Sequence, residues 1–192
     1  FLMTFLPNFD NSGTVELHLT SAVPTTVSVE YPANSPRFTT STAVGPDNIT
    51  IIELPASAAQ SWTPGAVQNN AVYASSDDDF VAYMMSDAAP ALPVDRMNTE
   101  YFVTTYQGGT PEFAVVAASD NTTVTITPTT GSPSTVVLNR GEGYLVQDNS
   151  DLTGTKISAD KPVGMTNGNK CVSYEGACHH IFEVALPVQA RE

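Results

Sequence analysis

Basic residues are scarce in this chain, which has 7 Lys and Arg against 20 Asp and Glu and a formal net charge of −13. Nucleic acids and anionic membrane surfaces both select clustered Lys and Arg, so this balance argues against both as partners. Charged residues of either sign make up only 14% of the chain, against about 25% in a typical soluble domain. An acidic surface of this kind favours solubility, cations or basic partners.

Long apolar runs are also missing, since no stretch approaches the roughly 18 residues of a membrane-spanning helix. The apolar opening, residues 1–9, is short and interrupted by Pro7, and no charged segment precedes it. It is therefore interpreted as a first strand of a chain trimmed at Phe1 rather than as a signal peptide.

Helical periodicity is nearly absent, because 14 prolines and 12 glycines divide the chain into short runs rich in Val, Ile, Thr, Tyr and Phe. Such runs, spaced by about 8 to 12 residues with turn signals between them, are typical of β-sandwiches and barrels. The fold is therefore predicted to be all-β. The predicted strands after the opening are 15–19, 26–31, 49–54, 71–75, 80–85, 101–106, 113–118, 123–128, 135–140, 143–148, 155–159, 162–167 and 180–186.

One pattern of residues occurs twice. Residues 19–32, LTSAVPTTVSVEYP, resemble residues 118–128, ASDNTTVTITP, and each stretch is followed by a further strand and by a pair of strands whose turn contains aspartate. In this interpretation 49–54 corresponds to 135–140. A single such sheet has one apolar face that needs a partner. An internal duplication is therefore predicted, with two antiparallel β-sandwich units that could share an interface.

The predicted units are residues 1–98 and 99–192, and the Pro-rich stretch 86–99 is predicted to connect them.

Motifs for hydrolytic catalysis are missing, because the chain has neither a G-x-S-x-G elbow nor an H-E-x-x-H pair. His18 lies in an alternating strand. His180 and Glu183 are three residues apart, so on a strand their side chains point to opposite faces. These positions indicate structural roles, and the chain is predicted not to be an enzyme.

Cysteine is limited to Cys171 and Cys178. Two cysteines this close in a chain rich in Thr, Ser and Asn favour a disulfide that closes the loop 171–178, over a pair of reduced thiols. Together with His179 and His180 they could supply four zinc ligands, but their spacing matches no common zinc finger.

The densest run of carboxylates is Asp77, Asp78 and Asp79, in a predicted turn between strands. Three like charges repel each other, and a bound calcium ion would relieve the repulsion. The run lacks the alternating spacing of an EF-hand loop, so a solvated turn is the alternative.

A second oxygen-rich turn contains Asp148, Asn149 and Asp151. These side chains could also bind calcium, and they suit Asx-turn geometry equally well. No cofactor is otherwise predicted.

Trp62 is the single tryptophan. An exposed indole ring stacks on sugars, so Trp62 is the best candidate for ligand contact. The alternative is that it fills the junction between the two units.

The second half of the chain resembles a known family. Three stretches carry the resemblance: FVTTYQGGTPEFAVVAASDNTTVTITP, then VVLNRGEGYLVQDNSDLTGTKISADKPVGMTNGNKCV, then ACHHIFEVALPV. They are similar to the N-terminal region of IgGFc-binding proteins, which is also found in bacterial surface proteins. The matching positions are Ala117, Asp120, Asn121, Thr123, Val124, Leu138, Gly141, Leu152, Gly154, Lys161, Pro162, Cys171, Cys178, His180, Glu183 and Pro187.

The resemblance covers residues 100–190, and the first half fits more loosely, through Leu6-Pro7-Asn8 and the order of its strands. Departures occur at 165–167, where the family strand is more apolar, and at 186–188, where the family ends on two prolines. The resemblance implies adhesion or scaffolding at extracellular, mucus-like surfaces, and Fc binding is not transferred to this chain.

The sequence therefore predicts a non-catalytic, extracellular or surface-displayed adhesion module of a larger protein. Its partners would be a glycan or glycoprotein and neighbouring domains of the same chain, without nucleic acid or membrane insertion. The alternatives are a structural spacer with no ligand, a carbohydrate-binding module attached to an enzyme, and an enzyme whose cleft holds carboxylates of raised pKa.

Overall fold

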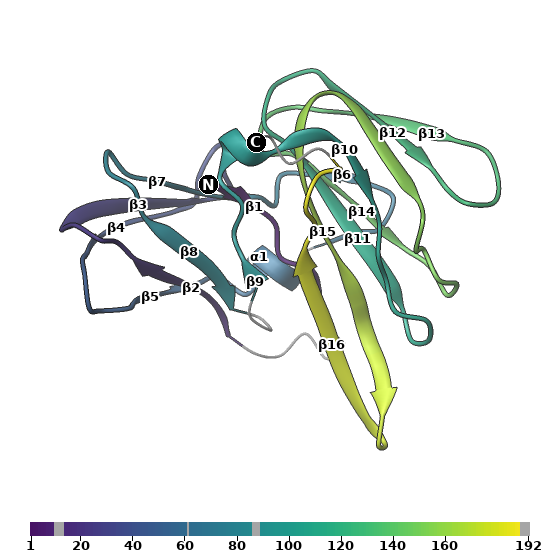
Figure 1. Cartoon of the computed structure of the whole chain (residues 1–192), viewed down its shortest axis with the longest axis horizontal. Coiled ribbons are helices and arrows are strands. Elements are labelled where there is room, and N and C mark those ends of the chain that lie inside the picture. The colour runs from purple at the N-terminus through teal and green to yellow at the C-terminus, as the bar shows by residue number, and fades with distance from the viewer. Residues whose placement is uncertain (10–13, 61, 86–88, 189–192) are drawn as a thin grey trace.

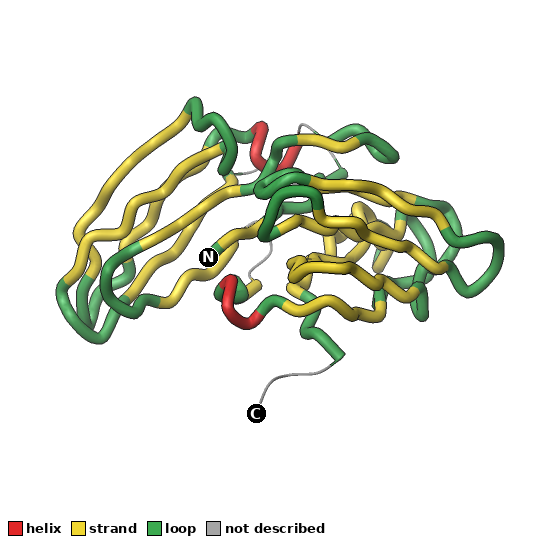
Figure 2. Tube along the Cα trace, turned by 90° about the horizontal axis from the view of Figure 1, so that it is seen from above, coloured by secondary structure: helices red, strands yellow, loops and turns green. Residues whose placement is uncertain are grey.

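The computed structural model describes residues 1–9, 14–60, 62–85 and 89–188, which are built almost entirely from strands (Figure 1). The strands form two lobes, and the two short helical segments, α1 (Ser57–Gln60) and η1 (Val94–Arg96), lie near the middle (Figure 2). The predicted all-β class is confirmed.

The first lobe is a sandwich of two four-stranded antiparallel sheets, with strand orders β1-β7-β3-β4 and β5-β2-β8-β9. Its strands are β1 (Leu2–Met3), β2 (Val15–Thr20), β3 (Thr25–Tyr31), β4 (Phe38–Val44), β5 (Thr50–Leu54), β7 (Val72–Ser75), β8 (Val81–Met85) and β9 (Ala89–Pro90). Side chains alternate between the two faces of a strand, so β2 and β3 place Leu17, Leu19, Val27 and Val29 in the core between the sheets.

The second lobe is held together by one long strand, β15 (Lys156–Tyr174). Residues 156–159 of β15 pair with β12, and residues 163–169 pair with β11, so β15 runs through both layers of the lobe. Pro162, which has no N–H to donate, lies where the pairing changes. The other strands are β10 (Asn98–Phe102), β11 (Pro111–Ala117), β12 (Thr122–Thr127), β13 (Ser134–Leu138), β14 (Gly143–Gln147), β16 (Ala177–Val184) and β6 (Val67–Gln68), which joins this sheet beside β14.

The two lobes have the same strand pairing. Six antiparallel pairs of the first lobe each have a counterpart in the second, in which the two ends of β15 take the places of β7 and β8. The pairs are β1–β7 and β10–β15, β2–β5 and β11–β14, β2–β8 and β11–β15, β3–β4 and β12–β13, β3–β7 and β12–β15, and β8–β9 and β15–β16. The internal duplication itself stays a prediction, and this shared pairing is what supports it.

The register of the pairs agrees with the repeated sequence. Val29 lies opposite Ala74 in the first lobe, and the corresponding Ile126 lies opposite Ile157 in the second. The predicted correspondence of the third strands was different, because β5 takes the place of β14 rather than that of residues 135–140. The strand that corresponds to β13 is β4, which the sequence analysis did not predict.

The lobes are joined by a continuous apolar contact. Three residues that precede the second lobe, Phe5, Leu6 and Trp62, belong to the same buried cluster as Leu145 and Phe182 of the second lobe. A second buried cluster joins Leu2, Ala33 and Ala71 to Met97 and Val116. The two lobes therefore share buried surface, and the second lobe also keeps a core cluster of its own, which includes Tyr101, Phe113 and Ile157.

Two other details differ from the sequence analysis. β4 is rich in Thr and Ser, and most of its side chains are half-buried or exposed, so it lacks the apolar alternation that identifies a strand. The predicted connector 86–99 holds β9, η1 and the start of β10, and its residues 86–88 lie outside the described part of the chain. The domain limits at 98 and 99 stay a prediction.

Candidate functional site

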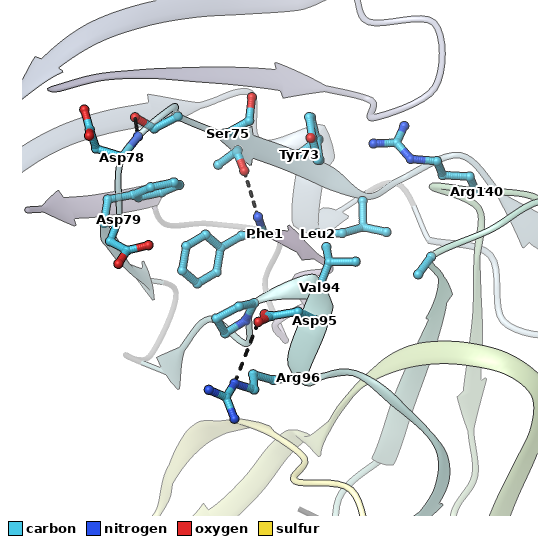
Figure 3. Close-up of a pocket in the computed structure, with 15 residues that line it drawn as sticks. Phe1, Leu2, Tyr73, Ser75, Asp78, Asp79, Val94, Asp95, Arg96 and Arg140 are labelled. Carbon is cyan, nitrogen blue, oxygen red and sulfur yellow. Dashed lines mark hydrogen bonds and ion pairs between the residues drawn. The ribbon is translucent and has the colours of Figure 1, made fainter. Parts of the chain in front are cut away.

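A hollow of about 550 Å³ lies between the lobes and is lined by residues from both (Figure 3). Tyr73 and Phe80 provide aromatic rings, and the Phe1 and Phe80 rings meet edge to face with centroids 4.8 Å apart. From the second lobe, the Arg140 guanidinium lies 4.7 Å from the centroid of the Tyr73 ring, a cation–π contact. Rings beside charged groups are suited to binding a polar ligand with a flat apolar face.

Carboxylates and guanidinium groups both line this hollow. Asp78 and Asp79 lie on one side, and Asp95 and Arg96 of η1 lie on the other, with Arg96 Nε 3.9 Å from Asp95 Oδ2 (Figure 3). The described residues that line the hollow include no histidine or cysteine. The arrangement offers hydrogen bonds and charge to a ligand.

The predicted turn Asp77–Asp79 is exposed, and two of its three aspartates, Asp78 and Asp79, line the hollow. The turn is fixed through its backbone, because the Ser21 hydroxyl donates to the carbonyl oxygen of Asp79 (2.6 Å). Among the described residues, no group of three or more His, Cys, Asp or Glu side chains is arranged to hold a metal. The calcium role of this turn stays a prediction.

The second predicted calcium turn is occupied by hydrogen bonds from the chain itself. Asp148 Oδ1 accepts from the backbone N–H of Ser150 (2.8 Å), and Asp151 Oδ1 accepts from the hydroxyls of Thr105 and Thr153, both at 2.7 Å. These bonds favour the ionised carboxylate, so they lower the pKa of Asp151, with the Thr153 side chain as the largest cause. The turn thereby fastens the loop after β14 to the loop after β10.

Trp62 is buried, with 9% of its surface exposed, and its Nε1 donates to the carbonyl oxygen of Phe5 (2.8 Å). Its ring covers Gly143 so closely that a Cβ there would lie 2.6 Å from the indole Cη2. Trp62 therefore fills the junction between the lobes, which was the alternative to ligand contact. Contact of Trp62 with a ligand stays a prediction that its burial does not favour.

The cysteine loop forms the tip of a long hairpin, made by the end of β15 and by β16, that projects beyond the body of the protein (Figure 1). The predicted disulfide between Cys171 and Cys178 is present, with their Cα atoms 5.1 Å apart. Ser173 and the turn residues Glu175 and Gly176 are exposed. Pairing and cross-link together fix the backbone of a tip that packs against little else.

Asn169 anchors the base of this hairpin. Its buried side chain accepts from the backbone N–H groups of Thr110 (3.0 Å) and Cys171 (2.9 Å) and donates to the carbonyl oxygens of Tyr106 (2.8 Å) and Gly108. Three of these bonds connect the loop after β10 to the beginning of the hairpin, and the bond from Cys171 lies within the hairpin. Sequence reasoning did not identify this residue, because its partners in that loop lie about 60 positions earlier in the chain.

The chain resembles a known protein family. The family model described as "IgGFc binding protein" matches residues 87–191, just over half of the chain. The chain belongs to the IgGFc-binding protein family. It is 31% identical over 113 residues to the human IgGFc-binding protein, and this match covers 51% of the chain but only 2% of the human protein. No solved structure matches the chain significantly. None of the helices in the described part of the chain has the length and hydropathy needed to cross a membrane.

The part matched by the IgGFc-binding family contains the second lobe except β6, and it contains the disulfide hairpin, whereas β1 to β8 lie outside it. The hollow in Figure 3 thus has one wall inside the matched range, formed by η1 and Arg140, and one wall outside it. The hairpin lies entirely inside it.

A buried carboxylate at the base of the hairpin was not identified from the sequence. Glu112 is completely buried, accepts from the Gln147 side chain (2.6 Å) and has its other oxygen 3.7 Å from His180 Nε2. Burial raises the pKa of Glu112, and the contacts with His180 and Gln147 oppose this rise. Structural roles were predicted for His180 and Glu183, but the carboxylate that lies near His180 is that of Glu112 on β11, which is separated from β16 by β15.

Proposed function

We propose that this chain is a non-catalytic recognition module of a larger secreted or surface-displayed protein. It binds a glycoprotein, through protein or glycan groups, on a cell or mucus-like surface. The observation that supports this most is the disulfide-closed hairpin, which presents exposed side chains on a fixed backbone away from the body of the protein.

The hairpin is suited to binding because it is ordered before a partner arrives. Ordering a loop on association costs free energy that a rigid loop has already lost on folding. Here the disulfide closes the tip, and Asn169 bonds the base to the loop after β10. A partner that meets residues 173–177 therefore does not have to order them.

An extracellular location is supported by the disulfide and by the charge. Disulfides persist in oxidising compartments and are rare in the cytosol. The net charge of −13 keeps a displayed domain soluble and favours basic patches on a partner.

The name of the human relative says that it binds the Fc part of IgG, and this chain matches 2% of that protein. An Fc fragment is therefore one surface in the test, beside a mucin-type glycoprotein and the same glycoprotein after removal of its glycans. The comparison separates recognition of sugar from recognition of protein. Each surface is tested with calcium and with a chelator, which also tests the predicted calcium turns.

The decisive variant is Glu175→Lys at the hairpin tip, compared with Asp47→Lys. Both residues are exposed acidic turn residues with positive φ, 50° and 60°, so the two substitutions have similar cost for the fold. Saturable binding that weakens at least tenfold, about 1.4 kcal/mol, with Glu175→Lys and not with Asp47→Lys supports the proposal. Binding to none of the surfaces, or equal losses in the two variants, contradicts it.

A spacer is the second candidate function, and the continuous apolar contact between the lobes favours it, since such a contact makes a rigid body. It predicts high stability and no saturable binding in the same assay. The carbohydrate-binding alternative depended on an exposed Trp62 ring, which is buried here.

A further inference from the structure

The shared pairing of the two lobes allows their surfaces to be compared residue by residue. In the first lobe Leu19 lies opposite Ala82, whose carbonyl accepts from the N–H of Ala91. In the second, Val115 lies opposite Met165, whose carbonyl accepts from the N–H of Ala185. Ala91 and Ala185 both begin the tetrapeptide Ala-Leu-Pro-Val, so the two sets of positions are equivalent.

One consequence concerns a row of residues across the outer face of each sheet. In the second lobe this row is Leu145, Ala114 and Thr166, which pair side by side. It is covered by the first segment of the chain: Leu145 is 0% exposed, and the Thr166 and Thr4 hydroxyls share a hydrogen bond of 3.2 Å. We refer to these three residues as the covered row.

The equivalent row of the first lobe is Ile51, His18 and Tyr83, which pair in the same way. No described segment covers it, and Ile51 is 56% exposed, with Tyr83 exposed beside it. Val81, two residues before Tyr83 and therefore on the same face of β8, is exposed too. We refer to the three paired residues as the open row.

The segment that does the covering also has an equivalent. Leu2 lies opposite Tyr73, which directly precedes Ala74, and Phe102 lies opposite Lys156, which directly precedes Ile157. Ala74 and Ile157 are equivalent, so Leu2 and Phe102 are equivalent too. The covering residues Leu2, Thr4 and Leu6 thus correspond to Phe102, Thr104 and Tyr106.

These equivalents cover nothing in the described part of the chain. Leu6 is 0% exposed, whereas Tyr106 is 61% exposed, and Phe102 and Thr104 are exposed as well. Together with Leu186 of the second Ala-Leu-Pro-Val they line a largely apolar groove of about 440 Å³, called the edge groove here. Leu92, the equivalent of Leu186, packs half-buried at the junction between the lobes.

We propose that copies of this chain associate head to tail, with the edge groove of one copy receiving the open row of the next. The junction inside the chain is one example of this contact, because there the equivalents of the groove and the row bury each other. The described residues thus leave one surface of each kind uncovered. Both carry large exposed apolar side chains, which single soluble domains seldom gather in one place.

The contact joins two different surfaces, so it does not close on itself in a symmetric dimer and can continue from copy to copy. It lacks the Trp62 and β6 segment that extends the internal junction, and we therefore expect it to be weaker than that junction. The inference does not rest on the proposed function, since it uses neither the hairpin tip nor a ligand.

The test is sedimentation velocity of the purified chain between about 10 μM and 1 mM, the range of weak protein contacts. The expected result is association that grows beyond the dimer with concentration. Tyr106→Glu in the groove and Tyr83→Glu in the row are each expected to weaken association at least tenfold. Val137→Glu, on exposed β13 outside both surfaces, is the control and is expected to have no effect.

Mixing the two variants gives the sharpest result. Tyr83→Glu keeps an intact groove and Tyr106→Glu keeps an intact row, so an equimolar mixture is expected to form dimers and nothing larger. Wild type that stays monomeric at 1 mM, a mixture without dimers, or an equal effect of Val137→Glu overturns the proposal. Circular dichroism checks the fold of each variant, and Phe102→Glu with Ile51→Glu provides a second pair at exposed positions.

Discussion

Phe5 and Thr105 hold equivalent positions in the two lobes, and their carbonyl oxygens are bonded by different means. The Phe5 carbonyl accepts from the indole of Trp62, in the long loop after β5. The Thr105 carbonyl accepts from the Thr153 hydroxyl (3.0 Å), in the short turn after β14 that Asp151 organises. The same backbone carbonyl is thus bonded by a buried aromatic ring where the lobe is covered, and by a polar turn where the lobe faces solvent.

One strand scaffold tolerates opposite surfaces when the polar backbone groups are satisfied in both lobes. A buried carbonyl without a partner is costly, so each lobe must supply a donor of some kind. Which donor it supplies follows from whether the other lobe lies on top.

The largest effect is expected from substitutions of Trp62, the buried ring at the junction between the lobes. Trp62→Ala removes a buried ring and the hydrogen-bond donor to the Phe5 carbonyl. We therefore expect the free energy of unfolding, measured by urea denaturation, to fall by about 3–5 kcal/mol. Trp62→Phe keeps much of the ring but no donor, and its expected loss is about 1–2 kcal/mol. A loss below about 1 kcal/mol for Trp62→Ala would show that the junction does not depend on this ring.

The next effect separates equivalent positions of the two lobes. Leu6→Ala is expected to cost about 2–5 kcal/mol, because Leu6 is buried against the second lobe. Tyr106→Ala is expected to stay within about 0.5 kcal/mol, because its side chain is exposed. Urea denaturation of dilute protein measures both, and similar losses in the two variants would contradict the difference in burial between these equivalent positions.

Much of this comparison could be expected from the sequence. The repeated Thr-Thr-Val stretch indicated two similar units, and strand alternation gave most strand positions, because both signals are local. The continuity of β15 and the partner of Glu112 could not be predicted in this way, since they depend on which strands pair across the chain. The burial of Trp62 likewise depends on Gly143, which lies 81 positions further on in the sequence.

A smaller effect concerns Glu112 and its equivalent Glu16. Burial raises the pKa of Glu112 above its ordinary value of 4.5. The carboxyl therefore stabilises the folded state fully when the pH is below 4.5, and this contribution is lost as the pH rises through the raised pKa. We therefore expect Glu112→Gln to raise the melting temperature at pH 7 by about 2–4 °C, and the gain to vanish near pH 4.

Glu16→Gln is the control for this prediction, because Glu16 is only partly buried and lies 2.8 Å from His18 Nε2. No gain is expected from it at either pH. A lower melting temperature for Glu112→Gln at pH 7 would mean that the attraction between Glu112 and His180 outweighs the cost of burial.

The smallest effect concerns the polar turn. Hydrogen bonds from Thr153 and Thr105 lower the pKa of the exposed Asp151, so its contribution is present above the ordinary value of 3.8 and is lost as the pH falls through the lowered value. Amide exchange of the Leu152 and Thr153 N–H groups, which bond to Thr105 and Asp151, should quicken in Asp151→Ala relative to the wild type. Unchanged exchange would show that Asp151 does not hold the turn.

The contact between Thr4 and Thr166 spans 162 positions of the chain. At synthesis rates of about 5–20 residues per second, the apolar segment around Thr4 leaves the ribosome roughly 10–30 s before the surface that covers it. During that interval Leu2 and Leu6 have no second lobe to bury them. The first lobe is therefore made with an exposed apolar edge, which stays unburied until its own second lobe is complete.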